Sequence, residues 1–159
     1  MATAYIETTI PSYYVARPSN SLTQAARQAI TRKWWDEGYS GFDLFTSQEV
    51  LDEVGRGEHV MADARMALLE KLEVLEITER VGNFAKDLVS TQLIPAKAAS
   101  DAVHIAVACV HELDFLVTWN CKQVANPFIR ERLRVMVASF GMHPPVICTP
   151  EELLKDEDY

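Results

Sequence analysis

Apolar residues along the chain gather in short strand-like runs that alternate with longer helical stripes. The short runs lie at 3–6, 42–46, 74–77, 115–118 and 146–148. Helical spacing, with caps, glycines and prolines near the ends, predicts helices over about 21–36, 48–54, 58–71, 79–93, 97–112 and 127–140, and a short one after residue 149. Strands that alternate with helices predict a three-layer α/β sandwich with a mostly parallel central sheet.

The same spacing predicts which face two of these helices bury. The first long helix carries one apolar stripe, at Leu22, Ala25, Ala26, Ala29, Ile30 and Trp34. In the helix after Ser47, Glu49 and Glu53 are four residues apart and share one side. Glu53 adjoins Val54 at the core boundary, so it is the better candidate to point inward toward a site. A solvated acidic helix is the alternative.

Length and composition indicate one folded unit. The chain has 159 residues, of which 48% are hydrophobic and 24% charged, and this supports one real core and argues against disorder. We expect a single domain over 1–150 and an acidic C-terminal tail over 151–159. The sequence has neither an apolar run of about 18–20 residues nor a leader-like N-terminus. We therefore expect a cytoplasmic protein with no membrane partner.

Net charge and cysteine content exclude fewer classes of function than length and composition do. The net charge of −8 has the wrong sign for a protein that binds nucleic acid by bulk electrostatics, but it does not exclude an enzyme that reaches phosphates through bound cations. Half of that charge, −4, lies in the last ten residues. The three cysteines are an odd number without a CxxC motif, so we expect cytosolic thiols packed as small hydrophobic residues.

Polar residues stand at the carboxyl ends of two predicted strands. Glu7 directly follows the first strand, and Thr118 and Asn120 end the fourth. In an open parallel sheet this edge is where ligands bind and chemistry takes place. For Glu7 alone, a surface carboxylate after an edge strand is the alternative.

Asp101 stands in the first turn of a helix that is apolar nearly all round. The helix dipole stabilises a carboxylate there, but burial is costly unless the group is paired or bound to a metal. A helix-capping role is the alternative. His104, one turn later, is predicted to be a hydrogen-bonded structural histidine rather than a metal ligand. Glu7, Glu53 and Asp101 together offer three carboxylates that can converge at one edge of the sheet.

Four segments in this order resemble the PIN-domain family of nucleases, which includes the VapC-type toxins of bacterial toxin–antitoxin pairs. They are YIETT at 5–9, SQEVLDEV at 47–54, DAVHIAVA at 101–108 and LVTWNCK at 116–122, and together they span nearly the whole chain. The family usually has aspartate at the position of Glu7 and often a second aspartate at that of Asn120.

The resemblance implies a ribonuclease that depends on Mg²⁺ or Mn²⁺ and is the toxin of a type II pair, with a cognate antitoxin as partner. It implies that the catalytic residues are Glu7, Glu53, Asp101 and Asn120, and that Glu7 and Asp101 hold the cation. Contacts to the RNA substrate are expected from Thr8, Thr118, Lys122 and Arg130. Residues 122–134 carry a charge of +3, for which a solvated helix face is the alternative.

Two other functions remain open. A catalytically weakened PIN-like module that binds protein or RNA would fit the changes at Glu7 and Asn120. A phospho-receiver-like regulator is disfavoured, because Glu7 is followed by two threonines rather than by a second acid. An aromatic cluster, Trp34, Trp35, Tyr39 and Phe42, predicts a homodimer or antitoxin surface, with ordinary core packing as the alternative.

Overall fold

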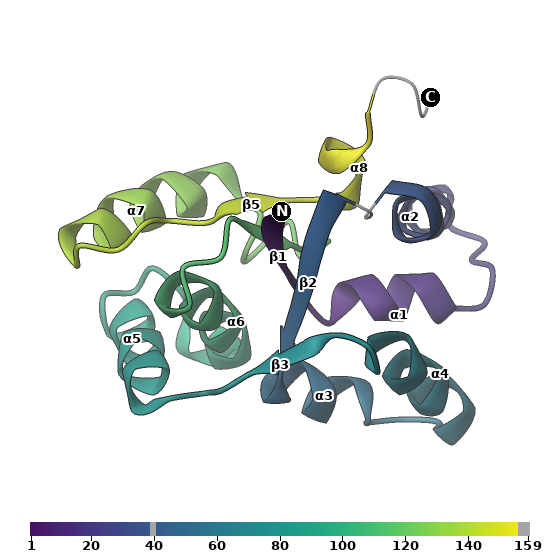
Figure 1. Ribbon diagram of the computed structural model, residues 1–159, viewed down its shortest axis with the longest axis horizontal. Coiled ribbons are helices and arrows are strands. Elements are labelled where there is room, and N and C mark those ends of the chain that lie inside the picture. Colours follow the sequence, from purple (N-terminus) through teal and green to yellow (C-terminus); the bar gives the residue numbers. More distant parts are fainter. Residues whose placement is uncertain (39–40, 156–159) are drawn as a thin grey trace.

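The computed structural model describes residues 1–38 and 41–155. Its centre is a sheet of five parallel strands in the order β3-β2-β1-β4-β5 (Figure 1). The strands are β1 (Ala2–Ile6), β2 (Phe42–Ser47), β3 (Glu73–Leu75), β4 (Phe115–Val117) and β5 (Val146–Cys148). The predicted parallel sheet is therefore confirmed, with β1 in the middle and its carboxyl end beside that of β4.

Helices cover both faces of the sheet. They are α1 (Thr9–Val15), α2 (Leu22–Lys33), α3 (Gln48–Val54), α4 (His59–Leu69), α5 (Glu79–Ser90), α6 (Ala99–Val110), α7 (Pro127–Ser139) and α8 (Pro150–Leu153). A π-helical turn (Trp34–Gly38) follows α2, and a 3-10 turn (Ala96–Ala98) precedes α6. Figure 1 shows α1, α2 and α4 on one side of the sheet and α5 and α6 on the other, which makes three layers. Within the described ranges, no helix is both long enough and apolar enough to span a bilayer.

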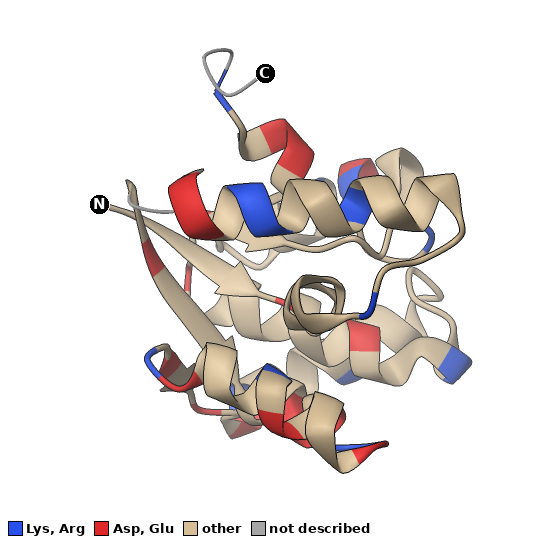
Figure 2. Ribbon diagram, turned by 90° about the vertical axis from the view of Figure 1, so that its right-hand side faces the viewer, with Lys and Arg blue, Asp and Glu red and all other residues tan. Residues whose placement is uncertain are grey.

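Helix α1 is missing from the sequence prediction. It begins two residues after the catalytic-candidate Glu7 and contains Pro11 in its first turn. A proline is tolerated there because the first amide groups of a helix have no intrahelical acceptor. The helix carries no charged residue and lies between α2 and α4 (Figure 2). It therefore turns the chain sharply at the end of β1 and keeps Glu7 at the sheet edge.

The predicted apolar stripe of α2 is buried only in part, since Leu22, Ala26 and Ala29 are exposed, Ala25 and Ile30 are half-buried and Trp34 is buried. Leu22 is 89% exposed, whereas Gln28 and Thr31 are buried. The reason is that α2 packs on α1 and its following loop through polar contacts. The Gln28 side-chain amide donates to the carbonyl of Arg17 (3.0 Å), and the Arg32 guanidinium donates to the carbonyl of Tyr14 (2.9 Å).

The aromatic cluster packs inside the chain. Trp34 is fully buried and Trp35 is 8% exposed, with their rings edge to face at 6.3 Å, and Phe42 is half-buried against the core. Tyr39 lies outside the described residues. The prediction of an exposed aromatic patch is therefore wrong for the two tryptophans, because the π-helical turn directs both into the core.

The C-terminal helix α8 spans the predicted boundary between domain and tail. Thr149 caps it, and Glu152 completes a capping box with the backbone amide of Thr149. Leu153 and Leu154 are partly buried against the core. Residues 156–159 of the predicted tail lie outside the described part of the chain.

Candidate active site

Glu7 is buried at the carboxyl end of β1, with 3% of its surface exposed. Its Oε2 accepts three hydrogen bonds, from the Thr9 amide (3.0 Å), the Thr9 hydroxyl (2.5 Å) and the Thr118 hydroxyl (2.7 Å). Burial raises the pKa of the Glu7 carboxyl, and these donors together with His104 act against that rise. The alternative of a surface carboxylate is excluded by this burial.

Thr118 and Asn120 form the neighbouring part of the edge, after β4. Thr118 is fully buried, and its hydroxyl contacts both Glu7 and the backbone amide of Asn120 (2.9 Å). The predicted contact between Thr118 and substrate is therefore replaced by a positioning role. The Asn120 side chain accepts from the Gln123 amide (3.1 Å) and also hydrogen-bonds with Asp101.

Glu53 reaches the same region from the last turn of α3. Its Oε1 accepts from the Thr8 hydroxyl (2.8 Å) and contacts His104 Nε2 (2.5 Å). Burial alone would raise the pKa of Glu53, but the hydrogen bond and charge of His104 outweigh it, so the pKa is lowered. Thr8, predicted to bind substrate, orients this carboxylate.

Asp101 lies half-buried in the first turn of α6, as predicted. Burial raises the pKa of its carboxyl, while His104 and Asn120 act in the opposite direction. The alternative of a capping role does not hold, because the cap residue of α6 is Ala98 and the helix has no side-chain capping bond.

His104 lies at the centre of these carboxylates. Its ring is completely buried, and its second nitrogen, Nδ1, contacts the Tyr5 hydroxyl (2.7 Å), which in turn contacts Ser47 Oγ (2.7 Å). Burial would lower the pKa of His104, but the hydrogen bond to Glu53 and the charges of Glu7, Glu53 and Asp101 raise it. The prediction of a hydrogen-bonded histidine is confirmed.

Sequence analysis missed that Tyr5 and His104 belong to the site itself. The spacing contained the signal. Tyr5 precedes Glu7 by two residues, so both face the same side of β1. His104 follows Asp101 by three, so both lie on one face of α6. Each pair therefore brings one unassigned polar residue to the carboxylates.

The two predicted basic contacts differ in placement. Lys122 is exposed in the turn just after Asn120. Arg130 instead lies against β5, where its guanidinium donates to the carbonyl of Ile147 (3.0 Å) and is 3.9 Å from the Glu152 carboxylate. The structure thus does not bring Arg130 to the carboxylates of the candidate site, because its guanidinium contacts the edge strand β5 and helix α8 instead.

The donor chemistry of the site fits a hard divalent cation. Carboxylate and amide oxygens are the ligands of Mg²⁺, which keeps several waters and often takes only one or two carboxylates. In 1–38 and 41–155, no group of three or more His, Cys, Asp or Glu side chains forms a ready metal site. Burial nevertheless raises the pKa of both Glu7 and Asp101, which means that their negative charge is incompletely balanced. A cation near either carboxylate would offset that cost.

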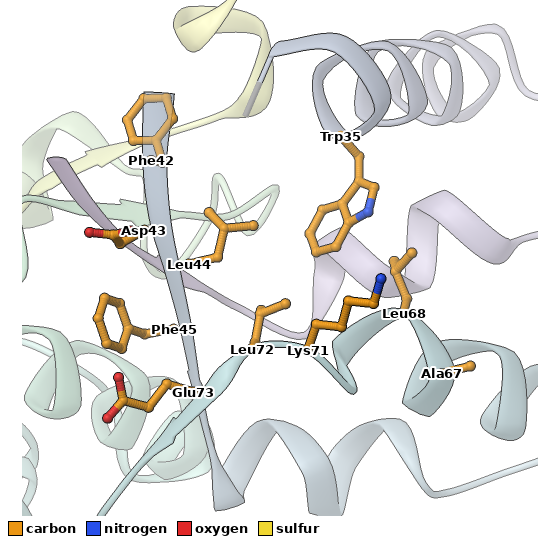
Figure 3. A pocket seen from close by; sticks show the side chains of 10 residues that line it. All are labelled: Trp35, Phe42, Asp43, Leu44, Phe45, Ala67, Leu68, Lys71, Leu72 and Glu73. Atoms are coloured by element: carbon orange, nitrogen blue, oxygen red, sulfur yellow. The ribbon is translucent and has the colours of Figure 1, made fainter. Parts of the chain in front are cut away.

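One hollow lies away from these carboxylates. It measures about 650 Å³ and is lined by Trp35, Leu44, Leu68 and Leu72, with Lys71, Asp43 and Glu73 among its polar residues (Figure 3). None of the predicted site residues lines it. We assign the candidate active site to the carboxyl edge of the sheet, because Glu7 is buried there and both Glu7 and Glu53 are held by hydrogen bonds.

Comparison with known proteins supports the fold. No protein-family model and no curated protein matches the sequence. The structure is similar to a chain of VapBC2 from Rickettsia felis. That complex was solved bound to a DNA fragment from the promoter of VapBC2 itself. That match has a TM-score of 0.51 and 13% identity, and covers 92% of this chain and 98% of the other. It is also similar to a chain of VapBC-1 from nontypeable Haemophilus influenzae, with a TM-score of 0.55, 14% identity, and coverage of 94% and 98%. At these identities the likeness is one of fold, and the predicted PIN-like three-layer sandwich is confirmed.

Proposed function

We propose that this chain is a metal-dependent ribonuclease and the toxin of a type II toxin–antitoxin pair. The observation that carries the proposal is that one buried histidine contacts Glu53 directly and is acted on by the charges of Glu7, Glu53 and Asp101, which come from three separate elements. A PIN-like fold shared with chains of VapBC structures supports it. The proposed partners are an RNA substrate and a cognate antitoxin.

Glu7 and Asp101 would hold the cation, Mg²⁺ or Mn²⁺, at the carboxyl edge of the sheet. When bound, such a cation neutralises charge on a phosphodiester and makes an attacking water more acidic. Three crowded carboxylates otherwise repel each other. One such cation would bring the charge of the three carboxylates from −3 to −1, which reduces the repulsion between RNA phosphates and a protein of net charge −8.

The remaining residues have roles that follow from their contacts. Thr9 and Thr118 hold Glu7, and Asn120 holds Asp101. Glu53 has a lowered pKa, so it is ionised at neutral pH, and both of its partners use Oε1. Glu53 would therefore accept a proton from the attacking water at Oε2.

One observation favours the alternative, a weakened PIN-like module that binds RNA or protein without cleaving it. Three donors already converge on Oε2 of Glu7, so a cation that uses this oxygen must compete with them. Such a module would bind RNA and leave its length unchanged.

Cation binding by Asp101→Asn tests the proposal. We expect calorimetry to give a loss of Mn²⁺ affinity of at least about tenfold, because a charged ligand becomes neutral. The control is Asp63→Asn, in which an exposed aspartate of α4 is changed in the same way, and we expect its affinity to equal that of wild type. Equal affinity in wild type and folded Asp101→Asn would remove Asp101 from the site.

A further inference from the structure

We propose that His104, backed by Tyr5, is a positioning residue that fixes Glu53 in the candidate active site and balances the carboxylates around it. The inference rests on the proposed function and deepens it, since it names two residues that act through Glu53.

The contacts of the imidazole fix its orientation. Nε2 contacts Glu53 Oε1 at 2.5 Å, and Nδ1 contacts the Tyr5 hydroxyl at 2.7 Å. The ring is fully buried, so any rotation loses a polar contact without replacement by bulk water. Ser47 holds the Tyr5 hydroxyl from the other side at 2.7 Å.

The resulting chain of contacts joins four elements. It runs from Ser47 at the end of β2, through Tyr5 in β1 and His104 in α6, to Glu53 in α3. Tyr5 and His104 are both buried, whereas the Glu53 side chain is 23% exposed. The buried contacts between Ser47, Tyr5 and His104 thus form a rigid base. The partly exposed carboxylate of Glu53 lies at the end of these contacts and reaches the site.

Charge gives the same residue a second role. Glu7, Glu53 and Asp101 all act electrostatically on the His104 ring, and the ion pair found at these carboxylates is the one between His104 and Glu53. Without the ring, Glu53 would lose its ion-pair partner, while the negative charge of Asp101 would still oppose its own. His104 therefore keeps Glu53 at the edge of the sheet as well as orienting it.

A double-mutant cycle between Glu53→Gln and His104→Gln tests the coupling. Glutamine places an amide near the position of Nε2 but carries no charge. We expect each single variant to lower the thermal unfolding midpoint, by up to about 10 °C, because it breaks the ion pair between a buried ring and a half-buried carboxylate. The double variant should lose no more than the larger single loss. Additive losses would overturn the proposal.

Glu49 offers a matched control on the same helix. Its Oε1 accepts from the Ser100 hydroxyl rather than from the histidine. We expect the losses of Glu49→Gln and His104→Gln to add, within error, in their double variant. Equal coupling of both glutamates to His104 would mean that the histidine serves general packing, and the proposal would fail.

Kinetics on single-stranded RNA separates positioning from stability. We expect His104→Gln and Glu53→Gln each to lower kcat by about 10- to 100-fold with KM within about twofold, and the double variant to be no slower than the slower single. Tyr5→Phe should lower kcat by a smaller factor, while Tyr14→Phe, which loses a surface hydroxyl bonded to Asp36, should match wild type. A full kcat in folded His104→Gln would overturn the proposal.

Failure of the two proposals can be told apart. If wild type cleaves no RNA, the ribonuclease function fails, and the unfolding cycle still decides the role of His104. If His104→Gln does not fold, the same cycle is measured with Tyr5→Phe and Glu53→Gln. Proton NMR provides a further readout: a protected imidazole N–H signal in wild type should persist in Glu49→Ala and disappear in Glu53→Ala, which removes the acceptor. Its persistence in Glu53→Ala would contradict the proposed contact.

Discussion

Replacing Glu7 by glutamine distinguishes the contribution of this residue to folding from its proposed contribution to cation binding. A glutamine Oε1 can occupy the position of the present Oε2 and accept from Thr9 and Thr118 at the same distances, 2.5–3.0 Å. The shape of the site is then kept, and only the negative charge is removed. We expect Glu7→Gln to fold normally and to lose cation binding.

The magnitude follows from two opposing terms. Hydrogen bonds to a charged acceptor contribute about 1.5–3 kcal/mol each, and those to a neutral one about 0.5–1.5 kcal/mol, so three contacts lose roughly 3 kcal/mol. Burying a neutral amide instead of a carboxylate recovers a similar amount, several kcal/mol. The net change is within about 1 kcal/mol, or about 2–4 °C in the unfolding midpoint. Mn²⁺ affinity should fall at least about tenfold.

Glu7→Asp is the matched variant with the opposite pattern. Its carboxylate keeps the charge but retreats by about one C–C bond, roughly 1.5 Å, so the threonine donors fall out of reach. We expect a loss of roughly 2–4 kcal/mol, or about 10 °C, with cation binding and RNA cleavage kept or raised. Scanning calorimetry and Mn²⁺ titration on both variants check this. Unchanged Mn²⁺ affinity in Glu7→Gln would refute the placement of Glu7 among the ligands.

Three further outcomes are expected. Because the pKa of His104 is raised, its pairing with Glu53 stabilises the folded state fully below about pH 6.5, and this stabilisation is lost as the pH rises through the raised pKa. The unfolding midpoint, measured by circular dichroism, should therefore fall over that pH range in wild type but not in His104→Gln. Trp35→Ala should cost about 3–5 kcal/mol of stability, measured by urea unfolding, and leave the sedimentation coefficient unchanged, because this side chain packs inside the chain. Arg130→Gln should lower the unfolding midpoint without weakening RNA binding. Lys122→Gln should weaken RNA binding without lowering the midpoint. Filter binding to single-stranded RNA is the assay.

The strands and most helices could be predicted because their signals are local. Short apolar runs separated by capped helical stripes led to a parallel sheet, and the structure has these strands within one or two residues. Helix α1 was not predicted from the pattern, although Pro11 lies in its first turn, where a proline is acceptable. The buried face of α2 depends on partners: Gln28 is buried because its acceptor, the carbonyl of Arg17, lies in the loop after α1.

In the candidate site, too, some features have a local sequence signal and others depend on distant partners. Glu7, Glu53 and Asp101 were predicted from their places on the elements; Glu53 contacts the His104 ring, and the charges of all three carboxylates act on it. The role of His104 depends on Tyr5 and Glu53, which are 99 and 51 residues away along the chain. Pairings of that range follow from the register of strands and the packing of helices, and periodicity within one segment does not contain them.

The most direct test of the ribonuclease proposal is cleavage of a mixed-sequence single-stranded RNA by the purified chain, with Mn²⁺ present or removed by chelation. We expect endonucleolytic products from wild type with Mn²⁺, no products after chelation, and none from Asp101→Asn under either condition. Asp63→Asn should cleave like wild type. RNA that is bound but remains full-length in wild type with Mn²⁺, or cleavage that continues unchanged in Asp101→Asn, would contradict a metal-dependent nuclease at this edge of the sheet.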